Sequence, residues 1–466
     1  MQLAEFHRQL DEVARQLATD PDAARRLLAE TLAAAPSDST ALARAALLLH
    51  RSGRTEDALR WMEAALTMDP RAELQNDYGS LLLASGRLPA AMDAYQSAIR
   101  ADAGYALAHV NLADALSSQH RHQEALGHYR RAVALSPRSS EGHFGIASAL
   151  LNLGQSETAL AACQTALELR PGDAATRHFL AVALTQNGQF VEARAAITSL
   201  LAERPDYAKG WHTLGNIEGE LGTAAAALAA YRRALELDPQ LEEARFDIAA
   251  LGAASPPPTM PPEYLVRLFD TYAPNFDREL VEKLDYRVPE NLLSLVRDHA
   301  AGMQPRWEIL DLGCGTGLLG KQFRRLASRL VGVDLSPAML RRAEISGQYD
   351  RLICGDVTAA LTSQPDTYDL ILAADLLIYV GELRPLFAAC AQRLKAAGRL
   401  AVSIETVESA EPYVLRETRR YAHTLEYLQA LAAANGLTLV EARATSLRRA
   451  PTGFVPGHLI LLQVPS

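Results

Sequence analysis

The first half of the chain shows a pattern of small, large and turn-forming residues that recurs about every 34 residues. Prolines mark it at Pro36, Pro70, Pro137, Pro171, Pro205 and Pro239, and the one long gap divides around Ala103. Twelve residues before each mark stands an alanine, namely Ala24, Ala58, Ala91, Ala125, Ala159, Ala193 and Ala227. Eight residues before each mark stands a larger residue, namely Leu28, Met62, Tyr95, Tyr129, Cys163, Ile197 and Tyr231. Such a period indicates a repeat architecture.

Each repeat predicts two antiparallel helices. Glycine allows the chain to turn between them, alanine allows the helices to approach closely, and proline ends the second helix. Glycines recur at the expected turns, at Gly53, Gly86, Gly154, Gly188 and Gly222. We therefore expect about seven helical units over residues 3–239, followed by a solvating cap helix over 241–252.

The repeat resembles the tetratricopeptide motif. Its best copy has Trp211, Leu214, Gly215, Gly222, Ala227, Tyr231, Ala234 and Pro239. The resemblance implies a superhelix whose concave face holds a protein or peptide. The predicted groove residues are Phe144, His178, Lys209, His212, Asn216 and Glu220. The alternatives are that these positions are simply solvated, or that the repeats serve a structural role or build a homo-oligomer.

The helical pattern of residues 1–252 stops near Gly252, and the proline-rich segment 253–262 reads as a stiff, extended linker. Beyond it, over 263–466, short aliphatic runs alternate with helical stretches. This alternation predicts an α/β domain with a doubly wound, Rossmann-like sheet. Two strands near 437–447 and 457–465, separated only by a loop, predict a reversed final hairpin.

A glycine-rich loop follows the first predicted strand, with the sequence Asp311-Leu-Gly313-Cys-Gly315-Thr-Gly317. Glycines there let the backbone pass close to a ligand. The second strand ends at Asp334, seventeen residues after Gly317, where a carboxylate can accept both ribose hydroxyls of a bound nucleotide. Asp356 ends the third strand and could accept from an adenine amino group, or it could simply cap the following turn.

These motifs resemble the class I S-adenosylmethionine-dependent methyltransferases, and most closely the bacterial group in which tetratricopeptide repeats precede the catalytic domain. The resemblance implies a seven-stranded sheet and S-adenosyl-L-methionine as cofactor, with S-adenosyl-L-homocysteine as product. The implied cofactor-binding residues are Asp311, Gly313, Cys314, Gly315, Gly317, Asp334, Leu335, Asp356, Val357 and Tyr272. Asp311 and Gly313 would lie near the methionine moiety and Leu335 against adenine. Tyr272 and Phe276 form a lid, or they pack a helix onto the sheet.

The acceptor is expected beyond the fourth strand, where Asp375 and Tyr379 are the polar candidates. His423 is the candidate base, and the alternative is that it is a hydrogen-bonded structural residue. No (Asn/Asp)-Pro-Pro-(Phe/Tyr) motif follows that strand, which disfavours methylation of exocyclic amino groups on nucleic-acid bases. We expect methyl transfer to a protein or peptide recruited by the repeats, because tethering raises the acceptor's effective concentration. A small-molecule methyltransferase and an inactive scaffold are the alternatives.

Composition narrows the functional class further. A net charge of -9 argues against a nucleic-acid-coating protein. The four cysteines have no CxxC spacing, so we predict neither disulfides nor a metal site. The N-terminus does not resemble a signal peptide, and no apolar run is long enough to span a membrane. We therefore expect a cytoplasmic protein.

Overall fold

The computed structural model describes residues 3–33, 37–300, 306–450 and 453–465. The chain divides into two compact units, Met1–Leu151 with Gln155–Phe179, and Asn152–Gly154 with Leu180–Ser466. The sequence-predicted ranges 1–252, 253–262 and 263–466 follow changes in local pattern. The compact units instead follow contacts between residues in space. The second unit therefore contains the last repeats, the proline-rich segment and the sheet.

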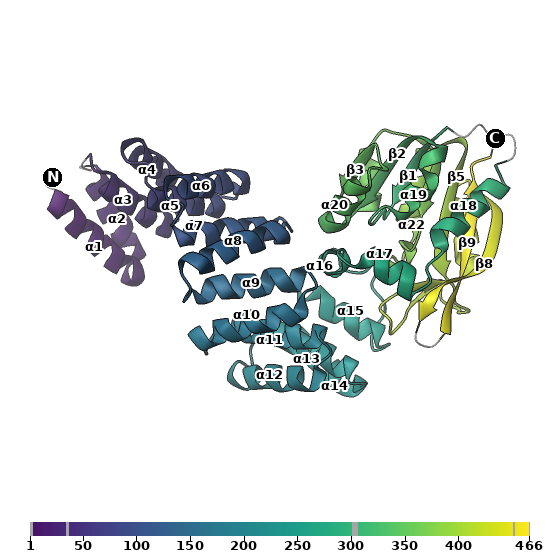
Figure 1. Ribbon diagram of the computed structural model, residues 1–466, viewed down its shortest axis with the longest axis horizontal. Coiled ribbons are helices and arrows are strands. Elements are labelled where there is room, and N and C mark those ends of the chain that lie inside the picture. Colours follow the sequence, from purple (N-terminus) through teal and green to yellow (C-terminus); the bar gives the residue numbers. More distant parts are fainter. Residues whose placement is uncertain (1–2, 34–36, 301–305, 451–452, 466) are drawn as a thin grey trace. The chain divides into compact units, whose positions relative to one another are not determined.

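Helices fill the described part of the chain up to residue 250 (Figure 1). Their bounds are α1 Leu3–Thr19, α2 Pro21–Leu32, α3 Ser39–Arg51, α4 Thr55–Met68, α5 Ala72–Ala84, α6 Leu88–Ala101, α7 Ala106–Ser118, α8 His122–Leu135, α9 Ser140–Asn152, α10 Ser156–Leu169, α11 Ala174–Gln186, α12 Phe190–Glu203, α13 Ala208–Glu220, α14 Ala224–Leu237 and α15 Glu242–Ala250. Consecutive helices pack in pairs, such as α3 with α4 and α13 with α14. This arrangement confirms the predicted helical repeats.

The repeat pattern has a clear packing basis. A Cβ at Gly215 on α13 would lie 2.4 Å from the ring of Tyr231 on α14, so the glycine makes room for the large residue of the same unit. Gly222 has a φ of +75° at the turn between these helices, a conformation that favours glycine. Prolines such as Pro239 follow the second helices, whereas Pro36 lies outside the described residues.

Helix α15 forms where a cap helix was predicted, but it does not present a solvated outer face. Ala244 and Ile248 pack with Tyr231 of α14. Phe246, which is fully buried, packs with Met260 and Tyr421. The prediction of a solvating cap is therefore wrong, because α15 is covered by its own repeat and by segments that follow it in the sequence.

The proline-rich segment is hydrogen bonded to later parts of the chain through residues 257–260. The backbone N–H of Met260 donates to the carbonyl of Tyr379 at 3.0 Å, and that of Gly381 donates to the carbonyl of Pro258 at 2.9 Å. The hydroxyl of Tyr421 donates to the carbonyl of Pro257 at 2.7 Å. The segment thus lies against the region around Tyr379 instead of acting as a free spacer.

The rest of the chain forms a seven-stranded sheet in the order β3-β2-β1-β4-β5-β9-β8 (Figure 1). The strands are β1 Trp307–Leu312, β2 Ala327–Asp334, β3 Arg351–Cys354, β4 Tyr368–Ala373, β5 Leu394–Glu405, β8 Thr438–Ala450 and β9 Gly453–Gln463, and β6 Tyr413–Leu415 pairs with β7 Tyr421–His423 in a separate hairpin. Strands β1 to β5 run parallel, whereas β9 is antiparallel to β5 and β8. The predicted Rossmann-like sheet with a reversed final hairpin is confirmed.

Helices cover both faces of this sheet. They are α16 Pro262–Tyr272, α17 Phe276–Arg278, η1 Glu279–Lys283, α18 Val288–Asp298, α19 Leu318–Phe323, η2 Arg324–Leu326, α20 Pro337–Ser346, α21 Val357–Ser363, η3 Leu377–Tyr379, α22 Arg384–Arg393 and α23 Leu425–Ala434. Leu310 and Leu312 of β1 pack with residues of α21, α22 and α23. Ile309 of the same strand packs with residues of α18 and α19. Within the described ranges, no helix has the length and apolar character needed to cross a membrane.

Candidate functional site

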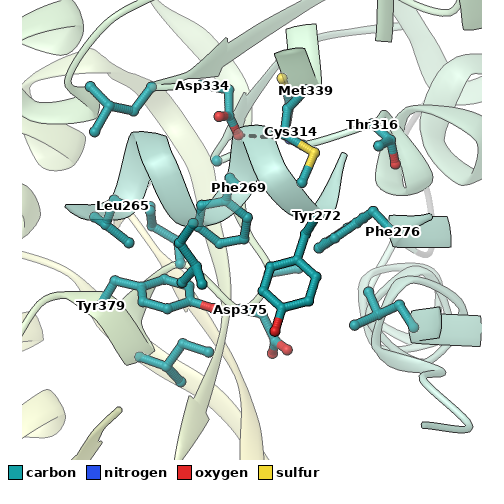
Figure 2. A pocket seen from close by; sticks show the side chains of 18 of the residues that line it. Leu265, Phe269, Tyr272, Phe276, Cys314, Thr316, Asp334, Met339, Asp375 and Tyr379 are labelled. Carbon is teal, nitrogen blue, oxygen red and sulfur yellow. Dashed lines mark hydrogen bonds between the residues drawn. The ribbon is translucent and has the colours of Figure 1, made fainter. Parts of the chain in front are cut away.

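A cavity of about 490 Å³ lies where β1, β2, β3 and β4 end, the expected ligand position in an open α/β sheet. Most of the predicted site residues line it, namely Tyr272, Gly313, Cys314, Gly315, Asp334, Leu335, Asp356, Val357, Asp375 and Tyr379. Among the described residues, Asp311, Gly317 and His423 are predicted site residues of this domain that do not line it. The structure therefore gathers residues from four strand ends around one space. Figure 2 shows Cys314, Asp334 and Asp375 from three of these ends.

The glycine-rich loop shapes one wall of the cavity. Gly313 and Gly315 have φ values of +69° and +54°, in the left-handed region that favours glycine. A Cβ at Gly315 would lie 3.9 Å from the ring of Phe276, which also lines the cavity. Gly317 does not line the cavity. It has a φ of +93° and precedes α19, where its conformation lets the chain turn into that helix.

Asp334 is fixed by the backbone that surrounds it. One carboxylate oxygen accepts from the N–H of Gly315 at 2.8 Å, and the other accepts from the N–H of Ser336 at 2.8 Å. Burial raises the pKa of Asp334, and these two N–H groups oppose the shift. Each carboxylate oxygen can accept more than one hydrogen bond, so Asp334 can serve a ligand without leaving this position.

Asp356 both caps a helix and lines the cavity. One carboxylate oxygen accepts from the N–H of Ala359 at 2.8 Å, as an N-cap residue of α21 does. The capping alternative is therefore correct, but it does not exclude ligand contact, because the residue also lines the cavity beside Val357 and Leu335.

Asp311 lies behind the loop and is fully buried. Its carboxylate accepts from the hydroxyl of Tyr349 at 2.6 Å. Burial raises the pKa of Asp311 to about 7. Asp311 therefore pairs with Tyr349 and is not part of the cavity wall.

A helical segment before the sheet provides an aromatic wall. Phe269 and Tyr272 of α16 and Phe276 of α17 line the cavity. Figure 2 shows Phe269 and Tyr272 lying across from Tyr379 and Asp375, and the rings of Phe269 and Tyr379 meet edge to face at 5.3 Å. Tyr272 and Phe276 therefore both line the cavity, and their role as a lid over a bound cofactor stays a prediction.

Charged residues line the part of the cavity beyond β4. One oxygen of Asp375 accepts from the Ser403 hydroxyl at 3.2 Å, and the other pairs with Arg448 at 3.3 Å. Burial raises the pKa of Asp375, whereas the charge of Arg448 opposes the shift. Arg448 also pairs with Glu405, which in turn pairs with Arg416 at 3.0 Å. These four charged groups form a balanced, internally paired network.

Sequence reasoning missed this network and the arginines at 419 and 420, which also line the cavity. A charge inside an apolar strand, such as Glu405 at the end of β5, was the available signal, because a buried charge needs a partner. The identity of that partner depends on the fold.

The position of His423 contradicts its predicted role as a base. The ring is fully buried, and Nε2 donates to the carbonyls of Val380 and Gly381 at 2.9 and 3.2 Å. Burial lowers its pKa to about 4. The imidazole is therefore a neutral structural group that joins the β6–β7 hairpin to the loop after η3.

Two of the predicted groove residues are also engaged internally. The ring of His212 lies 2.7 Å from the carboxylate of Asp247, and Asn216 accepts from the Tyr231 hydroxyl at 2.9 Å and from Arg419 at 3.0 Å. These contacts contradict the alternative that His212 and Asn216 are simply solvated, and their place in a peptide-binding groove stays a prediction. Lys209 and Glu220 are exposed. In the first compact unit, Phe144 and His178 are half-buried, and both rings contact that of Phe179.

Comparison with known families agrees with this division of the chain. Residues 310–402 match the family model described as a methyltransferase domain. Three tetratricopeptide-repeat models match residues 18–73, 51–106 and 110–174, residues 150–217, and residues 208–241. The chain thus contains tetratricopeptide repeats followed by a methyltransferase domain.

Curated relatives match only part of this chain. A ubiquinone biosynthesis O-methyltransferase of Rhodopseudomonas palustris is 29% identical over 119 residues, 25% of this chain and 44% of that protein. The human methyltransferase-like protein 27 is 34% identical over 109 residues, 23% of this chain and 44% of that protein. The chain therefore spans less than half the length of these relatives. A crystal structure of magnesium protoporphyrin IX methyltransferase from Synechocystis, with bound SAM, aligns at 20% identity and a TM-score of 0.31, covering 38% of this chain and 79% of that one.

Proposed function

We propose that this tetratricopeptide-repeat chain is an S-adenosylmethionine-dependent methyltransferase whose acceptor is a small, largely apolar molecule. The observation that carries the proposal is one cavity with two kinds of lining. Asp334, Leu335 and Asp356, which suit a nucleotide, line one part, and apolar and charged side chains line the part beyond β4. The cavity's volume of about 490 Å³ is within the range of small-molecule sites.

The residues present fit the cofactor. Asp334 offers carboxylate oxygens suited to ribose hydroxyls, and Asp356 with Leu335 offers an acceptor and an apolar surface suited to adenine. The glycine loop leaves room that a side chain at Gly315 would fill. The relatives from Rhodopseudomonas palustris and human are named as methyltransferases, which supports the same assignment.

The bound cofactor would supply an activated methyl group on a sulfonium. The protein's part is then to position the acceptor and to exclude water, because orientation provides much of the rate in such a displacement. Phe269 and Tyr272 cover the cavity with aromatic surface, and Asp375 and Tyr379 offer polar groups at the end beyond β4. No base is assigned, since His423 lies outside the cavity wall.

A protein or peptide acceptor recruited by the repeats has less support. His212 and Asn216, two residues expected to hold such a partner, are occupied by internal hydrogen bonds. The exposed Lys209 and Glu220 leave an interaction role for the repeats open, and tetratricopeptide repeats commonly serve such a role. An inactive scaffold is disfavoured because the glycine loop, Asp334 and Asp356 remain arranged around the cavity.

Calorimetric titration of the full-length protein with S-adenosylmethionine and S-adenosylhomocysteine tests the proposal. NAD serves as a comparator that shares adenosine but lacks the amino-acid end. We expect binding of both sulfur compounds with clear preference over NAD. Absence of binding by either sulfur compound would overturn the cofactor assignment.

A further inference from the structure

The cavity has a chemical asymmetry that the methyltransferase assignment does not explain. Its cofactor side carries acidic groups, Asp334 and Asp356. Its other side carries arginines from the β6–β7 hairpin and from β8, namely Arg419, Arg420 and Arg448. A ligand in the cavity can pair only with an arginine whose charge is not neutralised by a protein carboxylate.

Two of the arginines are committed to protein carboxylates. Arg448 is almost fully buried and pairs with both Asp375 and Glu405. Arg419 donates through Nε to Asp247 at 2.6 Å. Because each of these guanidinium groups is already neutralised, neither supplies a net positive charge to the cavity.

Arg420 differs from both neighbours. Over the described ranges 3–33, 37–300, 306–450 and 453–465, its guanidinium forms no ion pair with a carboxylate within 4.0 Å. Its charge acts on the part of the cavity beyond β4, because it opposes the rise that burial causes in the pKa of Asp375 and of Tyr379. The side chain is half-buried, so the charge is only partly solvated.

The surface around this charge is apolar. Leu265 and Phe269 of α16 face Tyr379 in Figure 2, and Ile378 and Leu284 also line the cavity. A ligand that fills this end therefore buries apolar surface against these side chains. Any anionic group that it carries can reach the guanidinium of Arg420, which hydrogen-bonds with Tyr379. An arginine is well suited to carboxylate and phosphate because its planar fork donates two parallel hydrogen bonds.

We propose that the acceptor of this enzyme is an apolar molecule that bears one oxyanionic group, a carboxylate or a phosphate, and that Arg420 contacts this group. This proposal rests on the proposed methyltransferase function, because only a methyltransferase has a methyl acceptor. Arg420 is then a specificity-determining residue, which selects the acceptor by its charge.

Probe binding tests the assignment without any need for turnover. The probes are 4-phenylbutyrate, 4-phenylbutyl phosphate and the uncharged 4-phenylbutan-1-ol, titrated into the full-length protein with and without saturating S-adenosylhomocysteine. We expect at least one anionic probe to bind about 10- to 100-fold more tightly than the alcohol, the size expected for charge-assisted hydrogen bonds. The preferred anion identifies the carboxylate or phosphate source.

Variants isolate the residue. Arg420→Gln should abolish the preference for the anion, and Arg420→Lys should restore part of it. Arg342→Gln is the matched control, because it removes one exposed arginine of α20 that does not line the cavity. Each variant is also titrated with S-adenosylhomocysteine, whose affinity should not change in Arg420→Gln.

Three outcomes would overturn the inference. The first is equal binding of the acid, the phosphate and the alcohol to the wild type. The second is an anion preference that survives Arg420→Gln. The third is a loss of S-adenosylhomocysteine affinity in Arg420→Gln, which would show that the arginine holds the cofactor's own carboxylate. Failure of the cofactor to bind, with the anion preference intact, would instead count against the proposed function and leave the role of Arg420 standing.

Discussion

The guanidinium of Arg419 donates to the carboxylate of Asp247 at 2.6 Å, which joins a cavity-wall residue to helix α15. His212 approaches the other oxygen of the same carboxylate at 2.7 Å. The side chain of Asp247 is almost completely buried, and the charge of that carboxylate raises the pKa of Arg419 although burial opposes it. The last repeat and the β6–β7 hairpin therefore share one buried charge.

Replacing Asp247 with asparagine should destabilise the second compact unit. The change leaves Arg419 without its carboxylate, and breaking such a pair costs about 2–4 kcal/mol where one partner keeps some exposure. The midpoint of thermal unfolding, followed by circular dichroism, should fall. Glu242→Gln on the exposed side of α15 is the matched control and should have little effect. Equal midpoints for the two variants would show that the pair contributes nothing measurable.

Asp334→Asn should weaken binding of S-adenosylhomocysteine by about 100-fold, because hydrogen bonds to a charged acceptor contribute a few kcal/mol. Calorimetry measures this loss. Glu344→Gln removes an equivalent charge from the exposed face of α20, outside the cavity wall, and should bind like the wild type. Unchanged affinity in Asp334→Asn would remove this residue from the cofactor site.

Tyr272→Ala should lower cofactor affinity by about 10-fold while leaving the unfolding midpoint almost unchanged. Tyr272 is 48% exposed, so it contributes more surface to a ligand than to the core. Ile345→Ala is the control, since Ile345 is 86% exposed and lies outside the cavity wall. If Tyr272→Ala lowers stability as much as a core substitution does, its role is packing of α16 instead of ligand cover.

Ionisation of Asp311 should lower the free energy of unfolding as the pH rises. Its folded pKa of about 7 lies above the ordinary value of 3.8, so the folded state holds a proton that the unfolded state has lost between these values. Stability attributable to this group is therefore lost as pH increases from about 4 to 7. Urea unfolding at pH 5 and pH 7.5 should show a smaller decline for Asp311→Asn than for the wild type. Parallel declines would contradict the raised pKa.

His423 should act in the opposite direction. Its folded pKa of about 4 lies below the ordinary 6.5, so the unfolded state gains a proton first as the pH falls. Stability from the neutral ring is lost as pH decreases from about 6.5 to 4, at about 1.4 kcal/mol per pH unit. His423→Gln should lose less stability than the wild type between pH 7 and pH 5, with cofactor affinity retained. A large loss of cofactor affinity would place His423 in the ligand site after all.

Local patterns were sufficient to predict the repeats, the sheet and the glycine loop. Gly215 and Tyr231 follow from one repeat unit, and Gly313, Gly315 and Asp334 follow from strand ends and turn geometry, so short-range physics determines their positions. The same reasoning left His423 between a base and a structural residue, because a sequence does not show that the ring's donor is taken by the carbonyl of Val380.

Long-range pairing set the limit of prediction. Arg448 of β8 meets Glu405 of β5 because both strands flank β9 in the sheet, and it also meets Asp375, which follows β4. The contact of His212 with a carboxylate was not predicted, because that carboxylate, Asp247, belongs to a different helix. In both cases the partner is specified by the tertiary fold, which periodicity along the chain does not encode.

The burial of Phe246 between Met260 and Tyr421 bears on how such a protein could have been assembled in evolution. A recombination event at residue 252 would exchange one repeat array for another and would strip the catalytic half of an aromatic core residue and of the carboxylate at Asp247. Viable exchanges are then those whose crossover lies within the array, so that the last repeats and α15 are inherited with the methyltransferase domain. The repeats before them are the part of the chain that can vary in number and kind.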